Sequence, residues 1–185
     1  MIAFNTILKP VVAAFVVLTL GYTPARAQDA LELLFDQLAQ PEQNGWEIIE
    51  EEIRREWAQS GSHTIDFLML RGQQALESSD INAAIEHFTA LTDHAPEYAS
   101  GWSMRAQAYY AAGLYGPAID DLYHAIALEP RHFDAMFGLV IILGEIGRED
   151  EALAFLTMLR AIHPNYPELE LVEQEINTRS GAQDA

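Results

Sequence analysis

Histidines and a pair of aspartates are the residues of this sequence whose types could support chemistry. The six histidines are His63, His87, His94, His124, His132 and His163. A zinc site on a helix usually takes two ligands at positions i and i+4, and no two histidines have that spacing. Asp120 and Asp121 are adjacent, so on a helix their carboxylates face different ways. We therefore expect no metal, and histidines at the surface or at junctions between elements; a metal site is the alternative.

No motif of a common catalytic site occurs elsewhere in the chain. The sequence has no cysteine, which excludes a thiol nucleophile, a disulfide bond and a cysteine-linked lipid anchor. It also lacks a Gly-rich phosphate loop and a Gly-x-Ser-x-Gly nucleophile turn. We expect a protein that is not an enzyme and that has no cofactor. A small hydrolase is a third hypothesis, after the two binding functions given below.

Arg71 and Arg105 are the basic residues most open to a functional interpretation, and they lie 34 residues apart. One possibility is that they pair with carboxylates across a helix interface, such as Asp121 or Glu129. The other is that they direct an anion-binding guanidinium into a groove. Arg131 and His132 follow Glu129 and Pro130, where we expect a network that locks a junction.

The spacing of 34 residues recurs through the centre of the chain, from Ile65 to Tyr166. Bulky, small and ring-bearing residues return in register, and each unit closes on a proline. The equivalent residues are Leu68, Gly72, Ala75, Ala84, Phe88, Leu91 and Pro96; then Trp102, Ala106, Tyr109, Ala118, Leu122, Ala125 and Pro130; then Met136, Val140, Leu143, Ala152, Leu156, Leu159 and Pro164. The period indicates a repeat protein.

This pattern resembles the tetratricopeptide repeat, whose 34-residue unit is a pair of antiparallel helices. The resemblance implies an all-α fold, a right-handed solenoid of three such helical hairpins over residues 65–98, 99–132 and 133–166. Small residues at the eighth and twentieth positions let the two helices of a unit approach closely. Two segments, 57–62 and 128–133, are also similar to segments of exported bacterial repeat proteins of no assigned activity.

The flanking regions have helical patterns without the repeat. Residues 28–62 predict a non-canonical helical hairpin, with Asn44 capping its second helix and Trp46, Ile49, Ile53 and Trp57 on one face. The opposite face carries Glu47, Glu50, Glu51, Arg54 and Arg55, and we expect it to be solvated. Residues 167–180 predict a C-terminal capping helix with Leu169, Leu171, Val172 and Ile176, and 180–185 a frayed tail.

Residues 1–27 have the pattern of a secretory signal peptide, with an apolar run from Val11 to Leu20 and small residues at Ala25 and Ala27. We expect cleavage after Ala27 and a periplasmic or secreted protein without an integral membrane segment. An uncleaved membrane anchor is the alternative, but the run is shorter than the roughly 20 residues a spanning helix needs. Without Lys9 and Arg26, eight arginines face 28 acidic residues, a net charge of −20.

This acidity excludes nucleic acid and anionic lipid as partners and favours a neutral or cationic one. The charge can also serve only to keep the protein soluble and monomeric. The resemblance implies that a ligand lies in the concave groove lined by the first helix of each unit. The groove candidates are Asp66, Met69, Gln73, Ser103, Gln107, Tyr110, Phe137 and Ile141, with Leu76, Ser100, Asp134 and Gly144 at equivalent positions.

The groove departs from the carboxylate clamp of the family, because its lysines and asparagines are absent. Tyr110, Phe137 and Ile141 should form an apolar floor beside Gln107. The alternative is that the capping helix or the hairpin covers Phe137 and Ile141. We predict a periplasmic adaptor that holds a protein or peptide segment in the groove. The second hypothesis is a structural scaffold that self-associates through its hairpin or its cap.

Overall fold

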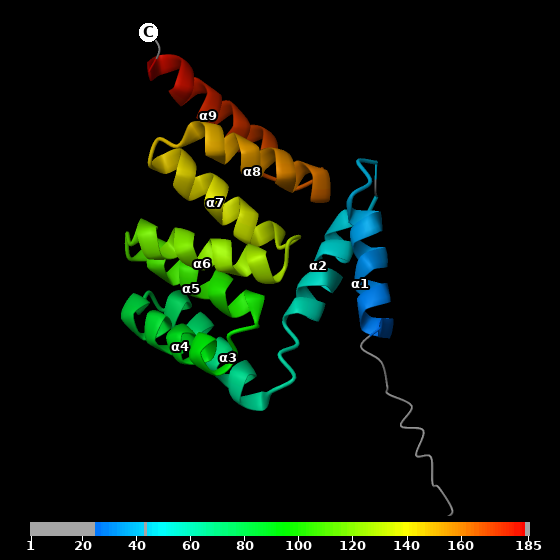
Figure 1. Ribbon diagram of the computed structural model, residues 1–185, viewed down its shortest axis with the longest axis vertical. Coiled ribbons are helices and arrows are strands. Elements are labelled where there is room, and N and C mark those ends of the chain that lie inside the picture. The colour runs from blue at the N-terminus through cyan, green and yellow to red at the C-terminus, as the bar shows by residue number, and fades with distance from the viewer. Residues whose placement is uncertain (1–24, 43, 184–185) are drawn as a thin grey trace, which may run out of the picture.

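The computed structural model describes residues 25–42 and 44–183, and the described residues form helices joined by short loops (Figure 1). A hairpin of α1 (Ala25–Leu38) and α2 (Trp46–Trp57) is followed by three helix pairs: α3 (His63–Glu77) with α4 (Ile81–His94), α5 (Ala99–Ala111) with α6 (Tyr115–Leu128), and α7 (Phe133–Glu145) with α8 (Glu149–Ile162). The last helix is α9 (Leu169–Gln183). The described part is all-α, as predicted. Of the predicted signal peptide, residues 1–24 lie outside it.

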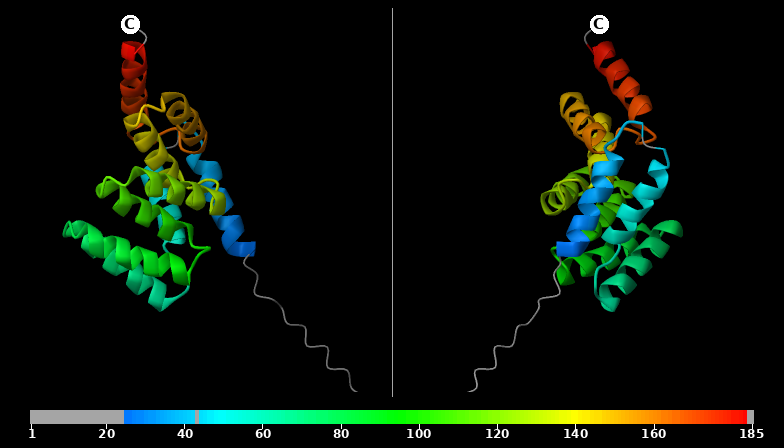
Figure 2. Two further views of the ribbon diagram at one scale, coloured as in Figure 1. Left: turned by 60° about the vertical axis from the view of Figure 1, so that its left-hand side comes forward. Right: turned by 90° about the vertical axis from the view of Figure 1, so that its right-hand side faces the viewer.

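The helices from α3 to α9 stack in chain order, and the hairpin lies beside the stack (Figure 1). Two further views show α1 and α2 against the same side of the stack, near α7, α8 and the start of α9 (Figure 2). The hairpin therefore does not continue the stack in front of α3, although it directly precedes α3 in the sequence. Among the described residues, no helix is long and apolar enough to cross a membrane.

Close helix contacts are made where the 34-residue pattern places small residues. Gly72, Ala106, Ala118 and Ala152 are all buried. Gly72 packs so closely on the ring of Phe88 that a Cβ atom there would overlap it. Since the larger side chains of one helix fill the space left by the small residues of the other, the pairs share one packed interior.

The turn inside each pair is also repeated at 34-residue spacing. Ser79, Gly113 and Gly147 have φ of 60°, 72° and 78°, the left-handed conformation that ends a helix. The next amide N–H reaches back to a helical carbonyl in each turn, as in Asp80 N–H to Ala75 O at 2.8 Å. Ser79 is the position at which the left-handed conformation is held without a glycine. The second helices end two residues before Pro96, Pro130 and Pro164, as the prolines predict.

Two predicted helix ends are wrong. The cap of α2 is Gly45 and not Asn44, because Gly45 takes a left-handed φ of 74° and turns the chain one residue later. The capping helix α9 starts at Leu169 and stays helical to Gln183, so the predicted frayed tail from Ser180 is wrong for 180–183. Arg179 donates to Gly144 O at 3.2 Å and to Glu175 at 2.6 Å, which fastens the last turns of α9 to α7. Leu171 is 68% exposed and lies outside the apolar face of α9.

Candidate functional site

One groove, about 630 Å³ in volume, runs along the first helices of the three repeats. It is lined by Met69 and Gln73 of α3, by Ser100, Ser103, Met104, Ala106, Gln107 and Tyr110 of α5, by Asp134, Phe137, Gly138, Ile141 and Ile142 of α7, and by Tyr98, Leu122, His132 and Tyr166. Arg54, Trp57 and Ala58 line it from the hairpin side. Seven predicted candidates, Met69, Gln73, Ser103, Gln107, Tyr110, Phe137 and Ile141, thus lie together.

The eighth candidate, Asp66, lies outside the lining. Its carboxylate accepts a hydrogen bond from the Ser60 hydroxyl at 2.5 Å, which ties the start of α3 to the linker after the hairpin. Its charge still acts on the groove: burial first, and then the charge of Asp66, raise the pKa of Tyr98, against a lowering hydrogen bond to Ser100. Asp66 therefore belongs to the rim of the groove.

The apolar floor is accessible at the third repeat. Phe137 and Ile141 are half-buried, and Phe137 packs against Tyr166 with ring centroids 5.0 Å apart. The capping region therefore contacts this part of the groove without closing it. Tyr110 stacks on Tyr115, and its hydroxyl donates to Glu145 at 2.7 Å. That hydrogen bond to Glu145 raises the pKa of Tyr110 to about 12.

The end of α2 forms one wall of the groove, and no sequence pattern predicts this. Arg54 extends toward α7 and binds Asp134 at 2.6 Å and Glu50 at 2.8 Å. The face that carries Glu50 and Arg54 was expected to be solvated, which is wrong for Glu50, whose side chain is 13% exposed; the Arg54 side chain is 42% exposed and still reaches α7. Glu47, Glu51 and Arg55 remain exposed. The i,i+4 spacing was correct for Glu50 and Arg54, but the spacing alone does not reveal that the same arginine reaches a partner 80 residues away.

Asp134 is the groove carboxylate whose surroundings are most unusual. Burial raises its pKa, and this effect outweighs the opposing effect of the neighbouring Arg54. The same arginine also serves Glu50, where burial alone would raise the pKa but the His163 hydrogen bond and Arg54 together lower it. One guanidinium therefore compensates two carboxylates at this end of the groove.

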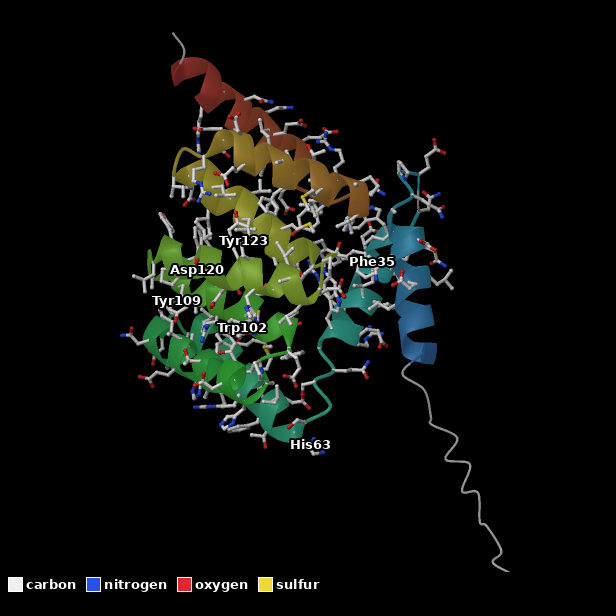
Figure 3. All side chains as sticks on the ribbon, viewed as in Figure 1. Phe35, His63, Trp102, Tyr109, Asp120 and Tyr123 are labelled. Atoms are coloured by element: carbon white, nitrogen blue, oxygen red, sulfur yellow. The ribbon has the colours of Figure 1, made fainter. Side chains whose placement is uncertain are left out.

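Trp57 anchors the hairpin to the start of α7. Its ring stacks on His132 at 4.4 Å between centroids and also contacts Phe133 and Phe35. Its carbonyl oxygen accepts from the Ser100 hydroxyl at 3.2 Å. Phe35 projects from α1 toward the stack (Figure 3). These rings place the end of α2 next to the groove.

The rest of the hairpin packs through buried apolar residues such as Leu38 and Ile53, and ion pairs join it to the repeats. Arg131 binds Glu32 through two hydrogen bonds of 2.8 and 2.9 Å and lies over the Phe35 ring, 4.0 Å from its centroid. His163 is fully buried and lies 3.0 Å from Glu50. The network expected at Arg131 and His132 does lock a junction, but the junction is between the hairpin and the repeats.

His132 is buried and caps α7, because its Nδ1 accepts from the Ala135 N–H at 3.3 Å. Burial lowers its pKa to about 4, so the ring is neutral near pH 7. Since Nδ1 accepts, the proton of the neutral ring is on Nε2. Within the described part of the chain, no three histidine, cysteine or acidic side chains are grouped as a metal site would require.

The two equivalent arginines have different roles. Arg105 binds Asp121 through two hydrogen bonds of 2.7 and 2.8 Å and the Thr92 hydroxyl at 2.8 Å. This agrees with the interpretation as a paired, structural residue. Arg71 instead donates to Gln74 on its own helix at 3.2 Å and is exposed. Neither arginine lines the groove.

Comparisons with known proteins agree with this architecture. The sequence profile of the tetratricopeptide repeat family matches residues 69–127. A TPR repeat-containing protein of Rhizobium etli is 33% identical over 135 residues, 72% of this chain and 66% of the relative's length. The chain is a tetratricopeptide repeat protein.

Solved structures with the same fold have lower sequence identity. The TPR2B domain of yeast Sti1, solved as a complex with pHsp70, has a TM-score of 0.60 and 22% identity and covers 64% of this chain and 99% of that domain. The second TPR domain of human RPAP3, in complex with the HSP70 peptide SGPTIEEVD, has a TM-score of 0.57 and 21% identity and covers 60% and 92%. At this identity the likeness shows the fold alone.

Proposed function

We propose that the protein is an exported adaptor that holds a segment of a partner protein in its concave groove. The observation that supports this most is the groove itself, with half-buried apolar side chains such as Tyr110, Phe137 and Ile141 on its floor. An apolar floor with a few polar groups, here Gln73 and Gln107, is the surface on which an extended or helical segment docks. The peptide in the complex of the second TPR domain of human RPAP3 also supports a peptide-binding role.

The groove is unsuited to the acidic peptide of the RPAP3 complex. A peptide with several carboxylates needs free cations, and the described lining residues include Arg54 as their one basic side chain, already bound to Glu50 and Asp134. A neutral or cationic protein segment fits better, and nucleic acid does not fit a chain of this charge.

The test begins with crosslinking and pull-down from the cell envelope fraction, and the captured partner is then titrated against the wild type and Tyr110→Ala. An anchor residue often contributes 2 kcal/mol or more, so we expect affinity to fall roughly thirtyfold. Circular dichroism melting of the variant should stay near the wild type, because Tyr110 lines a groove and is only half-buried. Unchanged affinity would move the binding site away from the groove.

Export is part of the proposal and rests on residues 1–27. Cleavage after Ala27 would place the mature protein in the periplasm or outside the cell. Mass analysis of the protein from its native host should show Gln28 as the first residue. An intact Met1 in the mature protein would remove the basis for the periplasmic location.

Self-association is a second candidate, because α3 has an uncovered apolar face. Phe67 and Leu70 are 59% and 50% exposed. The residues 34 positions later, Gly101 and Met104, belong to the α5 face next to the preceding repeat, and Gly101 packs against Leu91 there. Light scattering of the purified protein tests this function. A dimer that Phe67→Ser converts to a monomer, while Leu171→Ser on the exposed side of α9 does not, would favour the scaffold over the adaptor.

A further inference from the structure

The charges around the groove are unbalanced. Glu50 and Asp134 share Arg54 at one end, Glu145 holds the Tyr110 hydroxyl on a second side, and Asp66 lies near Tyr98 at the rim. Arg54 is the one basic residue among the described residues of the lining, and His132 is neutral near pH 7. Of these groups, Asp134 and Arg54 line the groove, and the other three carboxylates, Glu50, Glu145 and Asp66, lie around its lining.

The walls of the same groove are aromatic and apolar. Tyr98, Tyr110, Phe137 and Tyr166 line it together with Trp57, and all five are at most half-exposed. Rings of this kind attract a cation through their faces, and the methylene stem of an arginine or lysine packs along apolar walls while its charged head reaches a carboxylate. The groove therefore combines the two features that a basic side chain needs.

The ionisable groups that line the groove agree with a site short of positive charge. Burial first, and then nearby carboxylates, raise the pKa of Tyr98 and of Tyr166. The pKa of Tyr110 is raised by its hydrogen bond to Glu145, and that of Asp134 by burial. Each shift has the sign that a positive ligand group placed nearby would reduce. These shifts support the inference, which rests on the placement of the charges and rings.

We infer that the segment held in the groove carries a basic side chain between apolar residues, with the basic group directed at Asp134 and the rim carboxylates. This inference rests on the proposed function, because it names the chemistry of the ligand of that groove. The net charge of −18 of the whole chain also favours the approach of a basic segment from a distance. A segment of this kind would bind faster at low ionic strength than in high salt.

The test uses three fluorescent peptides with one alternating alanine and leucine frame and a central arginine, glutamine or glutamate. Their binding to the full mature chain is measured by anisotropy up to millimolar protein at low and high salt. We expect the arginine peptide to bind about tenfold more tightly than the glutamine peptide, and the glutamate peptide to bind least. The preference should shrink in high salt.

Two substitutions test whether the preference for the arginine peptide arises from the carboxylates at the rim of the groove. Glu145→Gln keeps an acceptor for the Tyr110 hydroxyl but removes a rim charge, and Asp66→Asn does the same for the Ser60 hydroxyl. We expect the combined variant to lose most of the preference for arginine over glutamine. Glu52→Gln is the matched control, since it removes the same type of charge from an exposed position of α2 that does not line the groove.

The outcomes separate this inference from the proposed function. Equal binding of the three peptides, lost in Tyr110→Ala, would overturn the basic ligand and leave the groove as the binding site. The inference would also be overturned if the preference for arginine survived in the combined rim variant. It would be overturned too if the preference fell equally in that variant and in Glu52→Gln, since an equal loss would show general charge attraction. Absence of binding of all three peptides at millimolar protein would overturn both.

Discussion

The repeats and the hairpin are both held by apolar packing, and the hairpin is held in addition by ion pairs between residues far apart in the sequence. Neighbouring repeats meet through apolar residues of complementary size, such as Gly101 with Leu91 and Gly138 with Leu122. The hairpin shares an apolar cluster with the repeats through residues such as Ile53, and ion pairs such as Arg131 with Glu32 join it to them as well. Apolar packing depends little on pH and salt, whereas ion pairs and buried histidines depend on both. The stack should therefore tolerate acid better than the position of the hairpin does.

The largest effect is expected from a cavity in the stack. Phe88 is fully buried against Gly72, and Phe88→Ala should lower the free energy of unfolding by about 3–5 kcal/mol. Phe67→Ala removes the same group from α3, where the side chain is 59% exposed, and should cost far less. Urea denaturation of both variants is the measurement. Similar losses would mean that α3 is covered in solution and would contradict the open face.

The next effect is a loss of stability at low pH at the contact between the hairpin and the repeats. The pKa of His132 is about 4 in the folded chain, whereas an ordinary histidine, as in the unfolded chain, has a pKa of 6.5. Between these two pH values the unfolded chain therefore binds more protons than the folded chain. Stability from this residue is present above pH 6.5 and is lost as the pH falls toward 4, by roughly 3 kcal/mol in total. Asp134, whose pKa is raised by burial, acts in the opposite direction, in a pH window that begins near the ordinary aspartate pKa of 3.8.

Hydrogen exchange at pH 7 and pH 4.5 checks this sign and its location. Amides of α2 and the first turn of α7 should lose protection before those of α4 and α6. His132→Asn keeps an acceptor for the Ala135 N–H and removes the titrating ring, so its stability should change less over the same pH range. An identical pH dependence in wild type and His132→Asn would exclude His132 as the cause.

A smaller effect tests the close helix approach. Ala118 is fully buried, and Ala118→Leu should overpack the middle repeat and cost on the order of 1–3 kcal/mol. Glu51→Leu changes an exposed residue of the hairpin and should cost little. Thermal melts of the two variants compare the two regions directly. Equal melting temperatures would count against the predicted register.

The smallest expected effect is an increase in the free energy of unfolding. Ser79 holds φ at 60° where the other two repeats have glycine, so Ser79→Gly should remove strain. The gain is offset in part by the entropy of the unfolded glycine, and about 0.5–1 kcal/mol of added stability is expected. Gly113→Ser, the reverse change one repeat later, should lose a similar amount. Denaturation midpoints of the pair provide the measurement.

Periodicity explains which features could be predicted from the sequence. Ala84, Ala118 and Ala152 recur in register, so their burial and the helix pairs around them follow from spacing. The groove residues Gln73, Gln107 and Ile141 follow as well, because the face opposite a packed face is fixed once the register is known. The structure brings them together in one groove.

The position of the hairpin could not be predicted, because its contacts do not recur. Arg54 meets Asp134 across 80 residues of sequence, and Glu50 meets His163 across 113. A single polar pair of this kind leaves no spacing pattern, and the i,i+4 pairing of Glu50 with Arg54 has the same appearance on a fully solvated helix. For the same reason the contribution of Trp57 to the groove had no signal in the sequence.

The uncovered face of α3 sets the order in which the repeats of the stack should unfold. In a linear array each unit is stabilised by its own packing and by its nearest neighbours. The pair α3–α4 borders one repeat, whereas α7–α8 borders a repeat, α9 and the hairpin. Partial opening at equilibrium, or under a pulling force, should therefore begin at α3 and proceed toward α7. The groove would then lose Met69 and Gln73 first and keep Phe137 and Ile141 until the last step.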